Sequence, residues 1–199
     1  MSFANKLVLA PWALKQLADF DRLSEILRAP EFEGWADDGG SKETVQAAVR
    51  LAKLQPQCAA IVILFDGEDD CPKELGETVR AWAKEAAGDT PCDVVIAYRE
   101  YETWFLAALE SLRGKYGIRD DAAAPANPES RRDAKSWLED FMPRHRAYSE
   151  TSDQAGMSDA FDMGLAHQRN RSFRKLVKAL GDLLTQLGQP LPAWPPANW

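Results

Sequence analysis

Hydrophobic positions along the chain follow two spacings, one typical of helices and the other of buried strands. Apolar residues recur at helical spacing over residues 14–27 and 41–54, where helices are predicted. Two short continuous apolar runs, 59–65 and 93–98, are instead typical of strands buried on both faces, as in a parallel sheet. The segment between them, residues 72–88, begins with a proline and predicts a helix that connects the two strands.

The rest of the chain is predicted to be mainly helical. An amphipathic helix is expected over 101–112, and a loop rich in Asp, Ala and Pro follows it. The last helical segments are expected at 131–141, 157–166 and 172–187. We expect the proline-rich tail after Gly188 either to pack as an extended strip or to stay loose.

The order of these elements indicates a fold class. Strands that alternate with helices through short turns favour a parallel sheet with right-handed crossovers. We therefore expect an α/β fold, a parallel sheet flanked by helices, with a helical last third of the chain. Residues 1–116 would form the α/β core, and residues 117–199 a helical extension packed on it. The length of 199 residues fits a single domain.

Acidic residues follow directly after both predicted strands. Asp66, Glu68 and Asp70 come after the first strand, and Glu100 and Glu102 come after the second. Ligands of open α/β sheets bind beyond the carboxyl ends of the strands, where these side chains would meet. Carboxylates at one edge repel one another unless a cation offsets their charge, and hard oxygen ligands suit Mg²⁺ or Mn²⁺. The pattern predicts a divalent metal site of the kind that serves phosphodiester cleavage.

A structural interpretation of the same acids stays open. The first cluster could be a solvated turn in which Asp69 or Asp70 caps the helix that begins near Pro72, and we weigh this evenly against a metal site. Acids are also common in the first turn of a helix because they interact favourably with the helix dipole. That explanation applies to Glu100 and Glu102.

A basic stretch, residues 167–175, stands out in a chain with a formal net charge of −7. Arg171 and Ser172 fall near the start of the last predicted helix, where backbone N–H groups can hold an anion, and Lys175 follows one turn later. These three residues are candidates for contacts to a nucleic-acid backbone. A solvated polar helix face is the stronger interpretation of this stretch judged alone.

Composition and motifs exclude several classes of function. His145 and His167 have no neighbours at metal-ligand spacing, and no nucleophile–histidine arrangement or glycine-rich phosphate loop is recognisable, so covalent hydrolysis and ATP binding by this chain are not expected. The three cysteines form no Cys-x-x-Cys pair. Sparse cysteines, the lack of a signal peptide and the lack of a membrane-length apolar run lead us to expect a cytoplasmic protein with no membrane association.

Several segments between about Ala59 and Leu180 carry a resemblance to a known family. They are residues 64–72, 95–106 with its Arg-Glu-Tyr-Glu-x-Trp block, 134–138, Tyr148 with Asp153-Gln154, and 171–176. Together they resemble an uncharacterised bacterial family with a Toprim-like domain. Toprim is the metal-binding α/β domain of topoisomerases, primases and the overcoming-lysogenization-defect nucleases. Such proteins look like partners of neighbouring ATPases in phage-defence or toxin-like cassettes.

The resemblance implies a Toprim- or Rossmann-like sheet and a Mg²⁺- or Mn²⁺-dependent nuclease or nuclease subunit, acting on nucleic acid with an ATPase encoded nearby. It carries a metal-binding role onto Asp66, Glu68 and Asp70. It carries a catalytic, acidic-site role onto Glu100 and Glu102. A place near the site is implied for further polar residues, with Lys135 as a catalytic candidate: Lys135, Asp153, Gln154, Arg171, Ser172 and Lys175.

One departure from the family pattern concerns its first strand. Toprim domains normally begin with a strand followed by a catalytic glutamate, whereas residues 6–11 are the only strand-like stretch near the start and no glutamate precedes Glu25. Either the chain starts downstream of that element or it is a degenerate subunit. The alternative expectation is a non-catalytic binding or regulatory subunit of an ATPase complex, and a metal-independent scaffold is a third. The oligomeric state stays open, a homo-oligomer included.

Overall fold

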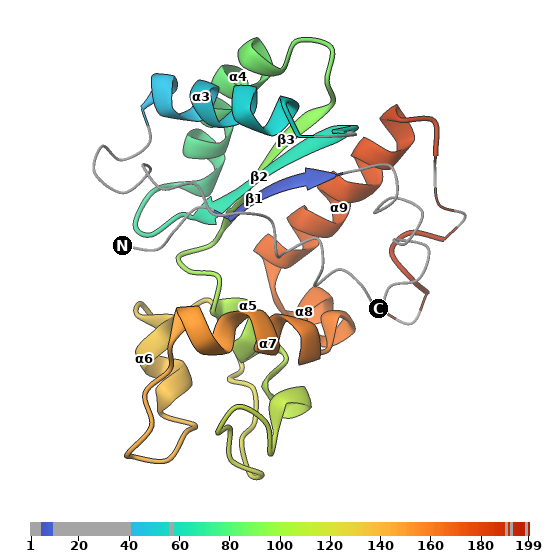
Figure 1. Cartoon of the computed structure of the whole chain (residues 1–199). Coiled ribbons are helices and arrows are strands. Elements are labelled where there is room, and N and C mark those ends of the chain that lie inside the picture. The colour runs from blue at the N-terminus through green and yellow to red at the C-terminus, as the bar shows by residue number, and fades with distance from the viewer. Residues whose placement is uncertain (1–4, 10–40, 56–57, 190, 192, 198) are drawn as a thin grey trace.

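The fold is α/β, as predicted, with a helical C-terminal part (Figure 1). This computed structural model describes residues 5–9, 41–55, 58–189, 191, 193–197 and 199. The helix predicted over 14–27 lies outside the described residues. The described α-helices are, in chain order, α3 (Lys42–Lys53), α4 (Pro72–Ala87), α5 (Thr103–Ala107), α6 (Ala134–Glu139), α7 (Ala155–Ala160), α8 (Met163–Arg169) and α9 (Arg171–Gln186).

Three described strands form one sheet in the order β1-β2-β3. The two strands predicted from continuous apolar runs, β2 (Ala60–Asp66) and β3 (Cys92–Ala97), pair in parallel, with Asp66 opposite Ala97. The third, β1 (Asn5–Leu9), pairs with β2 in the antiparallel direction, so the described sheet is mixed. Because β2 and β3 run in parallel, the residues that follow them leave the sheet at the same edge.

Each face of the sheet packs against its own set of helices. On one face, alternate residues of β2 such as Ile61 and Ile63 form a core with α3 and α4. On the other face, Val62 and Leu64 join a larger core that includes α9 and the helices before it. Figure 1 shows α3 and α4 on one side of the sheet and α9 crossing the other. Burial on both faces explains why the sequences of these strands are continuous apolar runs.

Local signals explain where the two helices beside the sheet begin and end. The Ser41 hydroxyl accepts a hydrogen bond from the backbone N–H of Thr44 and caps α3. Pro72 opens α4, where its missing N–H costs no hydrogen bond, and the helix ends at Gly88, whose φ is +60°. The predicted bounds of both helices are confirmed to within two residues.

In the last third, the helix predicted over 172–187 is confirmed as α9 to within one residue, whereas the two predicted before it are shorter or divided. The segment predicted over 157–166 divides into α7 and α8, because the Asp162 carboxylate accepts a hydrogen bond from Leu165 N and starts a new helix. The helix predicted over 131–141 begins only after Asp133, whose φ is +59°. After α5 the chain continues as a 3₁₀-helix, Leu109–Leu112.

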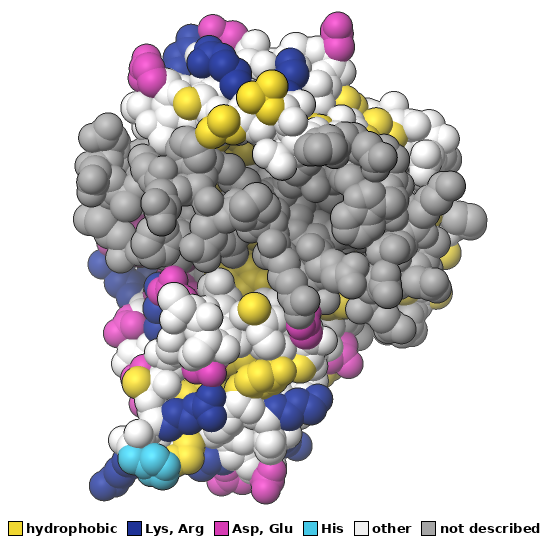
Figure 2. Space-filling view, viewed as in Figure 1, with side chains coloured by type: hydrophobic (Ala, Val, Ile, Leu, Met, Phe, Trp, Pro, Cys, Tyr) yellow, Lys and Arg dark blue, Asp and Glu magenta, His cyan; other side chains and the backbone are white. Residues whose placement is uncertain are grey.

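The tail packs against α9. Trp194 Nε1 donates a hydrogen bond of 2.7 Å to the carbonyl oxygen of Val177, and the Trp194 ring lies over Gly181, where a Cβ would approach within 2.5 Å. No helix within the described residues is long and apolar enough to cross a membrane. Figure 2 shows Lys and Arg side chains interspersed with Asp and Glu over the described part of one face.

Candidate functional site at the carboxyl edge of β2 and β3

The turn after β2 is attached by hydrogen bonds to the segment after β3. Gly67 N donates to Ala97 O and Glu68 N to Arg99 O, each at 2.9 Å. The Asp66 carboxylate accepts a bond of 2.8 Å from Tyr101 N. These contacts place the two predicted acidic clusters side by side at one edge of the sheet.

Glu100 connects this edge to α6. Its carboxylate is largely buried and accepts a hydrogen bond of 2.9 Å from the backbone N–H of Ala134, the first residue of that helix. The contact brings the start of α6, and therefore Lys135, to the segment after β3. Glu100 thus has a structural role whatever its chemistry.

Glu102 is the most deeply buried acid near the site, with none of its surface exposed. Its Oε1 accepts hydrogen bonds from Tyr148 Oη at 2.8 Å and from Gln154 Nε2 at 3.2 Å. Its Oε2 is buried and has no hydrogen-bond partner among the described residues. Burial raises the pKa of Glu102, although the bond from Tyr148 and the charge of Lys135 oppose that rise.

Lys135 brings a positive charge to this edge. It forms an ion pair with Glu150. Burial alone would lower the pKa of Lys135, but the hydrogen bond to Glu150 and the negative charges of Glu102, Glu150 and Asp66 outweigh it, so the pKa is raised. Lys135 therefore stays charged and lies within the electrostatic field of two of the predicted acids.

The other two acids of the first cluster lie on the surface. Glu68 and Asp70 are exposed, and the backbone of Glu68 adopts a φ of +46°. Asp69, between them, pairs with Arg132 at 2.8 Å. Within the described residues, no three His, Cys, Asp or Glu side chains are arranged so that they could hold a metal ion. Asp66, Glu68 and Asp70 therefore do not form a preassembled set of three ligands.

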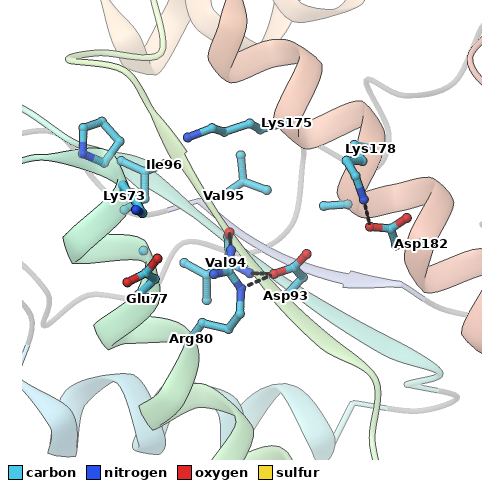
Figure 3. A pocket seen from close by; sticks show the side chains of 13 residues that line it. Lys73, Glu77, Arg80, Asp93, Val94, Val95, Ile96, Lys175, Lys178 and Asp182 are labelled. Carbon is cyan, nitrogen blue, oxygen red and sulfur yellow. Dashed lines mark hydrogen bonds and ion pairs between the residues drawn. The ribbon is translucent and has the colours of Figure 1, made fainter.

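The predicted phosphate contacts separate into buried and exposed residues. Ser172 is buried, where its hydroxyl accepts a bond from Trp104 Nε1 and donates one to Asn170 Oδ1. Its backbone N–H donates to Glu129 Oε1 at 3.3 Å, so a carboxylate of the chain occupies the N-terminus of α9. Arg171 and Lys175 are exposed, and Lys175 lines a cleft between α9 and α4 (Figure 3).

Two residues of the site did not emerge from the sequence. Glu150, the ion-pair partner of Lys135, lies in a short π-helix, Glu150–Gln154, that no periodicity indicates. Lys73 lines the same cleft as Lys175. In the sequence it follows the proline that opens α4 and has no feature that distinguishes it from other surface lysines. Asp153, which the resemblance placed near the site, pairs with Arg146 at 2.8 Å.

Comparison with known proteins identifies the family of this chain. A search of curated proteins found no match, and a search of solved structures found none. A family described as a domain of unknown function (DUF4276) matches residues 8–181. This span contains the described sheet apart from the first residues of β1, and it ends within α9. The chain belongs to the DUF4276 family.

Proposed function

We propose that this protein is a Mg²⁺- or Mn²⁺-dependent Toprim-like nuclease, or the nuclease subunit of a complex, acting on nucleic-acid phosphodiesters. The observation that carries the proposal is the position of Lys135, whose charge interacts with both Asp66 and Glu102 at the carboxyl edge of β2 and β3. Such an edge is where open α/β sheets bind ligands. A buried acid, a second acid and a cation together could position a phosphate and a nucleophilic water.

Two residues fit a divalent cation best. The buried Glu102 Oε2, which has no hydrogen-bond partner among the described residues, offers a hard oxygen, and Asp66 offers another. Mg²⁺ in phosphate chemistry usually takes one or two protein carboxylates and completes its shell with water and phosphate oxygens. When bound there, the ion would polarise the phosphate and activate water. Glu68 and Asp70, exposed on the adjoining loop, are further candidate ligands once substrate is bound.

The chain's own residues would do the remaining work. Lys135 would balance the negative charge of the phosphate and of the two acids during the reaction. Tyr148 and Gln154 would hold the Glu102 carboxylate in one orientation. Glu100 would keep α6, and with it Lys135, at the edge of the sheet.

Cleavage of labelled single-stranded DNA and RNA in Mg²⁺ and in Mn²⁺, with EDTA as control, tests the proposal. The wild type should cleave one of these substrates, alone or with the neighbouring ATPase that the resemblance implies. Asp66→Ala and Glu102→Gln should abolish cleavage while circular dichroism stays unchanged. Asp89→Asn, an exposed acid beyond the opposite end of β3, is the matched control and should cleave like the wild type. A wild type that cleaves neither substrate, alone or with that implied ATPase, would refute the enzyme proposal.

A second candidate is a non-catalytic Toprim-like subunit that recruits or regulates a cytoplasmic ATPase. The hydrogen bond from Ala134 N to Glu100 favours it, because that contact gives a predicted site acid a purely structural task. Calorimetric titration with Mn²⁺ separates the two candidates. A nuclease should bind Mn²⁺ and lose that binding in Asp66→Ala, whereas a metal-free subunit should pull down the ATPase without binding Mn²⁺.

A further inference from the structure

A cleft of about 280 Å³ lies between α4 and α9, beside β3 (Figure 3). Val95 and Ile96, each almost fully buried, contribute apolar surface to it. Four basic side chains surround this surface, two from α4 and two from α9: Lys73, Arg80, Lys175 and Lys178. The walls therefore combine positive charge with an apolar floor.

Two of the four cations form ion pairs with acids of the cleft. Arg80 pairs with Asp93 at 2.7 Å and also donates to the carbonyl oxygen of Val94. Lys178 pairs with Asp182, one turn further along α9. Each of these two pairs balances one positive charge with one negative charge.

Lys73 and Lys175 are the available cations. Neither forms an ion pair with another described residue, and both are exposed. Figure 3 shows Lys175 extending from α9 toward the part of the cleft where Ile96 and Lys73 lie. One acid of the lining, Glu77, opposes them. In a protein with a net charge of −7, a lining with four cations and three acids keeps a net positive charge, which favours an anionic ligand at that place.

The cleft adjoins the acidic edge through Ile96. A Cβ on Gly67, which follows Asp66, would lie 2.7 Å from Ile96 Cγ2, so the turn after β2 packs directly on this side chain. The same Ile96 lines the cleft and packs near Gly76 of α4. A ligand lying over Ile96 is therefore close to the turn that carries the acids.

We propose that this cleft binds the phosphodiester backbone of a single nucleic-acid strand and leads it to the acidic edge, with Lys73 and Lys175 as phosphate contacts. The inference rests on the proposed function, to which it adds the substrate path and Lys73. The volume lies just below that of sites for drug-sized ligands, about 300–1,000 Å³. It suits one nucleotide unit over an apolar floor.

Binding measured without cleavage tests the cleft separately from the chemistry. Fluorescence anisotropy in EDTA would use a labelled 20-residue single strand of mixed sequence, as DNA and as RNA, over a series of salt concentrations. The double variant Lys73→Gln/Lys175→Gln should bind on the order of tenfold more weakly. The slope of log K against log salt should become shallower by about 1.4, roughly 0.7 for each lysine that no longer neutralises a phosphate of a single strand. Glu77→Gln should tighten binding, since it removes the opposing charge.

Lys115→Gln is the matched control, because it removes one exposed positive charge from the turn after the 3₁₀-helix, outside the cleft. It should bind like the wild type. Wild-type binding by the double variant, or no binding of either strand by the wild type, would overturn the proposal. Whichever of the two labelled strands binds to the wild type identifies DNA or RNA as the source of the phosphodiester. The two proposals can fail separately. If binding depends on the two lysines but Glu102→Gln cleaves as well as the wild type, the cleft is supported and the catalytic site is refuted.

Discussion

Tyr148 donates its hydroxyl hydrogen to Glu102 Oε1 over 2.8 Å, and the two residues come from segments 46 positions apart. Glu102 is fully buried and Tyr148 is 9% exposed. Burial raises the pKa of the tyrosine, and the charge of Glu102 and the hydrogen bond raise it further. Tyr148 therefore remains a donor at all physiological pH values. The contact ties the segment before the π-helix to the segment after β3, where the acids of the site lie.

Replacing Glu102 by Gln should stabilise the protein at neutral pH. The pKa of Glu102 is raised in the folded state, chiefly by burial, so ionisation costs more in the folded than in the unfolded protein. Below the ordinary pKa of a glutamate the wild type is neutral in both states and gains nothing from the change. As the pH rises through the ordinary pKa toward the folded-state pKa, the wild type loses stability relative to the variant.

Urea unfolding of the wild type and Glu102→Gln between pH 4 and pH 8 measures this difference. The gap in free energy of unfolding should grow with pH and then level off. Asp89→Asn, an exposed acid, should show no such trend. A gap that shrinks with rising pH would mean that Lys135 and Tyr148 outweigh burial and that the sign of the shift is wrong.

Removing the tyrosine hydroxyl should destabilise the fold. In Tyr148→Phe the Glu102 carboxylate keeps only the bond from Gln154 and stays buried. Losing one partner of a buried acceptor costs about 1–3 kcal/mol. The free energy of unfolding at pH 7 should fall by that amount. Tyr98→Phe, a half-buried tyrosine beside Arg99, is the control and should change it far less.

The turn after β2 should not tolerate a side chain at Gly67. A Cβ there would lie 2.7 Å from Ile96 Cγ2 and 3.1 Å from the backbone oxygen of Ala97. Since the buried Ile96 side chain has to shift and the Ala97 carbonyl is also close, Gly67→Ala should lower the free energy of unfolding by about 1–3 kcal/mol. Gly76→Ala meets the same Ile96 at an ordinary 3.6 Å and lies inside α4, so it should instead stabilise by about 0.5–1 kcal/mol. Equal effects of the two changes would contradict this packing.

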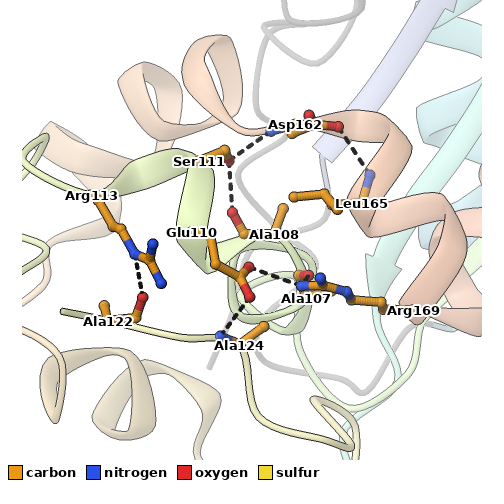
Figure 4. Close-up of polar contacts among 10 residues, drawn as sticks. All are labelled: Ala107, Ala108, Glu110, Ser111, Arg113, Ala122, Ala124, Asp162, Leu165 and Arg169. Atoms are coloured by element: carbon orange, nitrogen blue, oxygen red, sulfur yellow. Dashed lines mark hydrogen bonds and ion pairs between the residues drawn. The ribbon is translucent and has the colours of Figure 1, made fainter. Parts of the chain in front are cut away.

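An ion pair joins α8 to the 3₁₀-helix (Figure 4). Arg169 Nη1 donates to Glu110 Oε2 at 2.8 Å and to the carbonyl oxygen of Ala107, while Glu110 Oε1 accepts from Ala124 N. A double-mutant cycle with Glu110→Gln and Arg169→Met should give a coupling energy of about 0.5–1 kcal/mol, because both partners remain partly solvated. The more exposed Arg119–Asp121 pair should give a coupling near zero.

The sequence by itself determined the elements whose signals are local. Burial on both faces makes β2 and β3 continuous apolar runs, and Ser41, Pro72 and Gly88 mark helix ends through contacts within a few residues. It also placed the acids after the two strands, and parallel pairing of those strands brings any such residues to one edge. These features depend on residues close together in the chain, so the pattern of the sequence can predict them.

Only the tertiary structure decided which acids are buried and which are solvated. Glu102 and Glu68 look alike in the sequence, yet the first is enclosed by residues 46 and 52 positions away and the second faces solvent. The antiparallel direction of β1 and the meeting of Lys73 with Lys175 likewise depend on distant segments. Burial, partner choice and charge environment are set by which remote segment covers a residue, and no spacing along the chain encodes that directly.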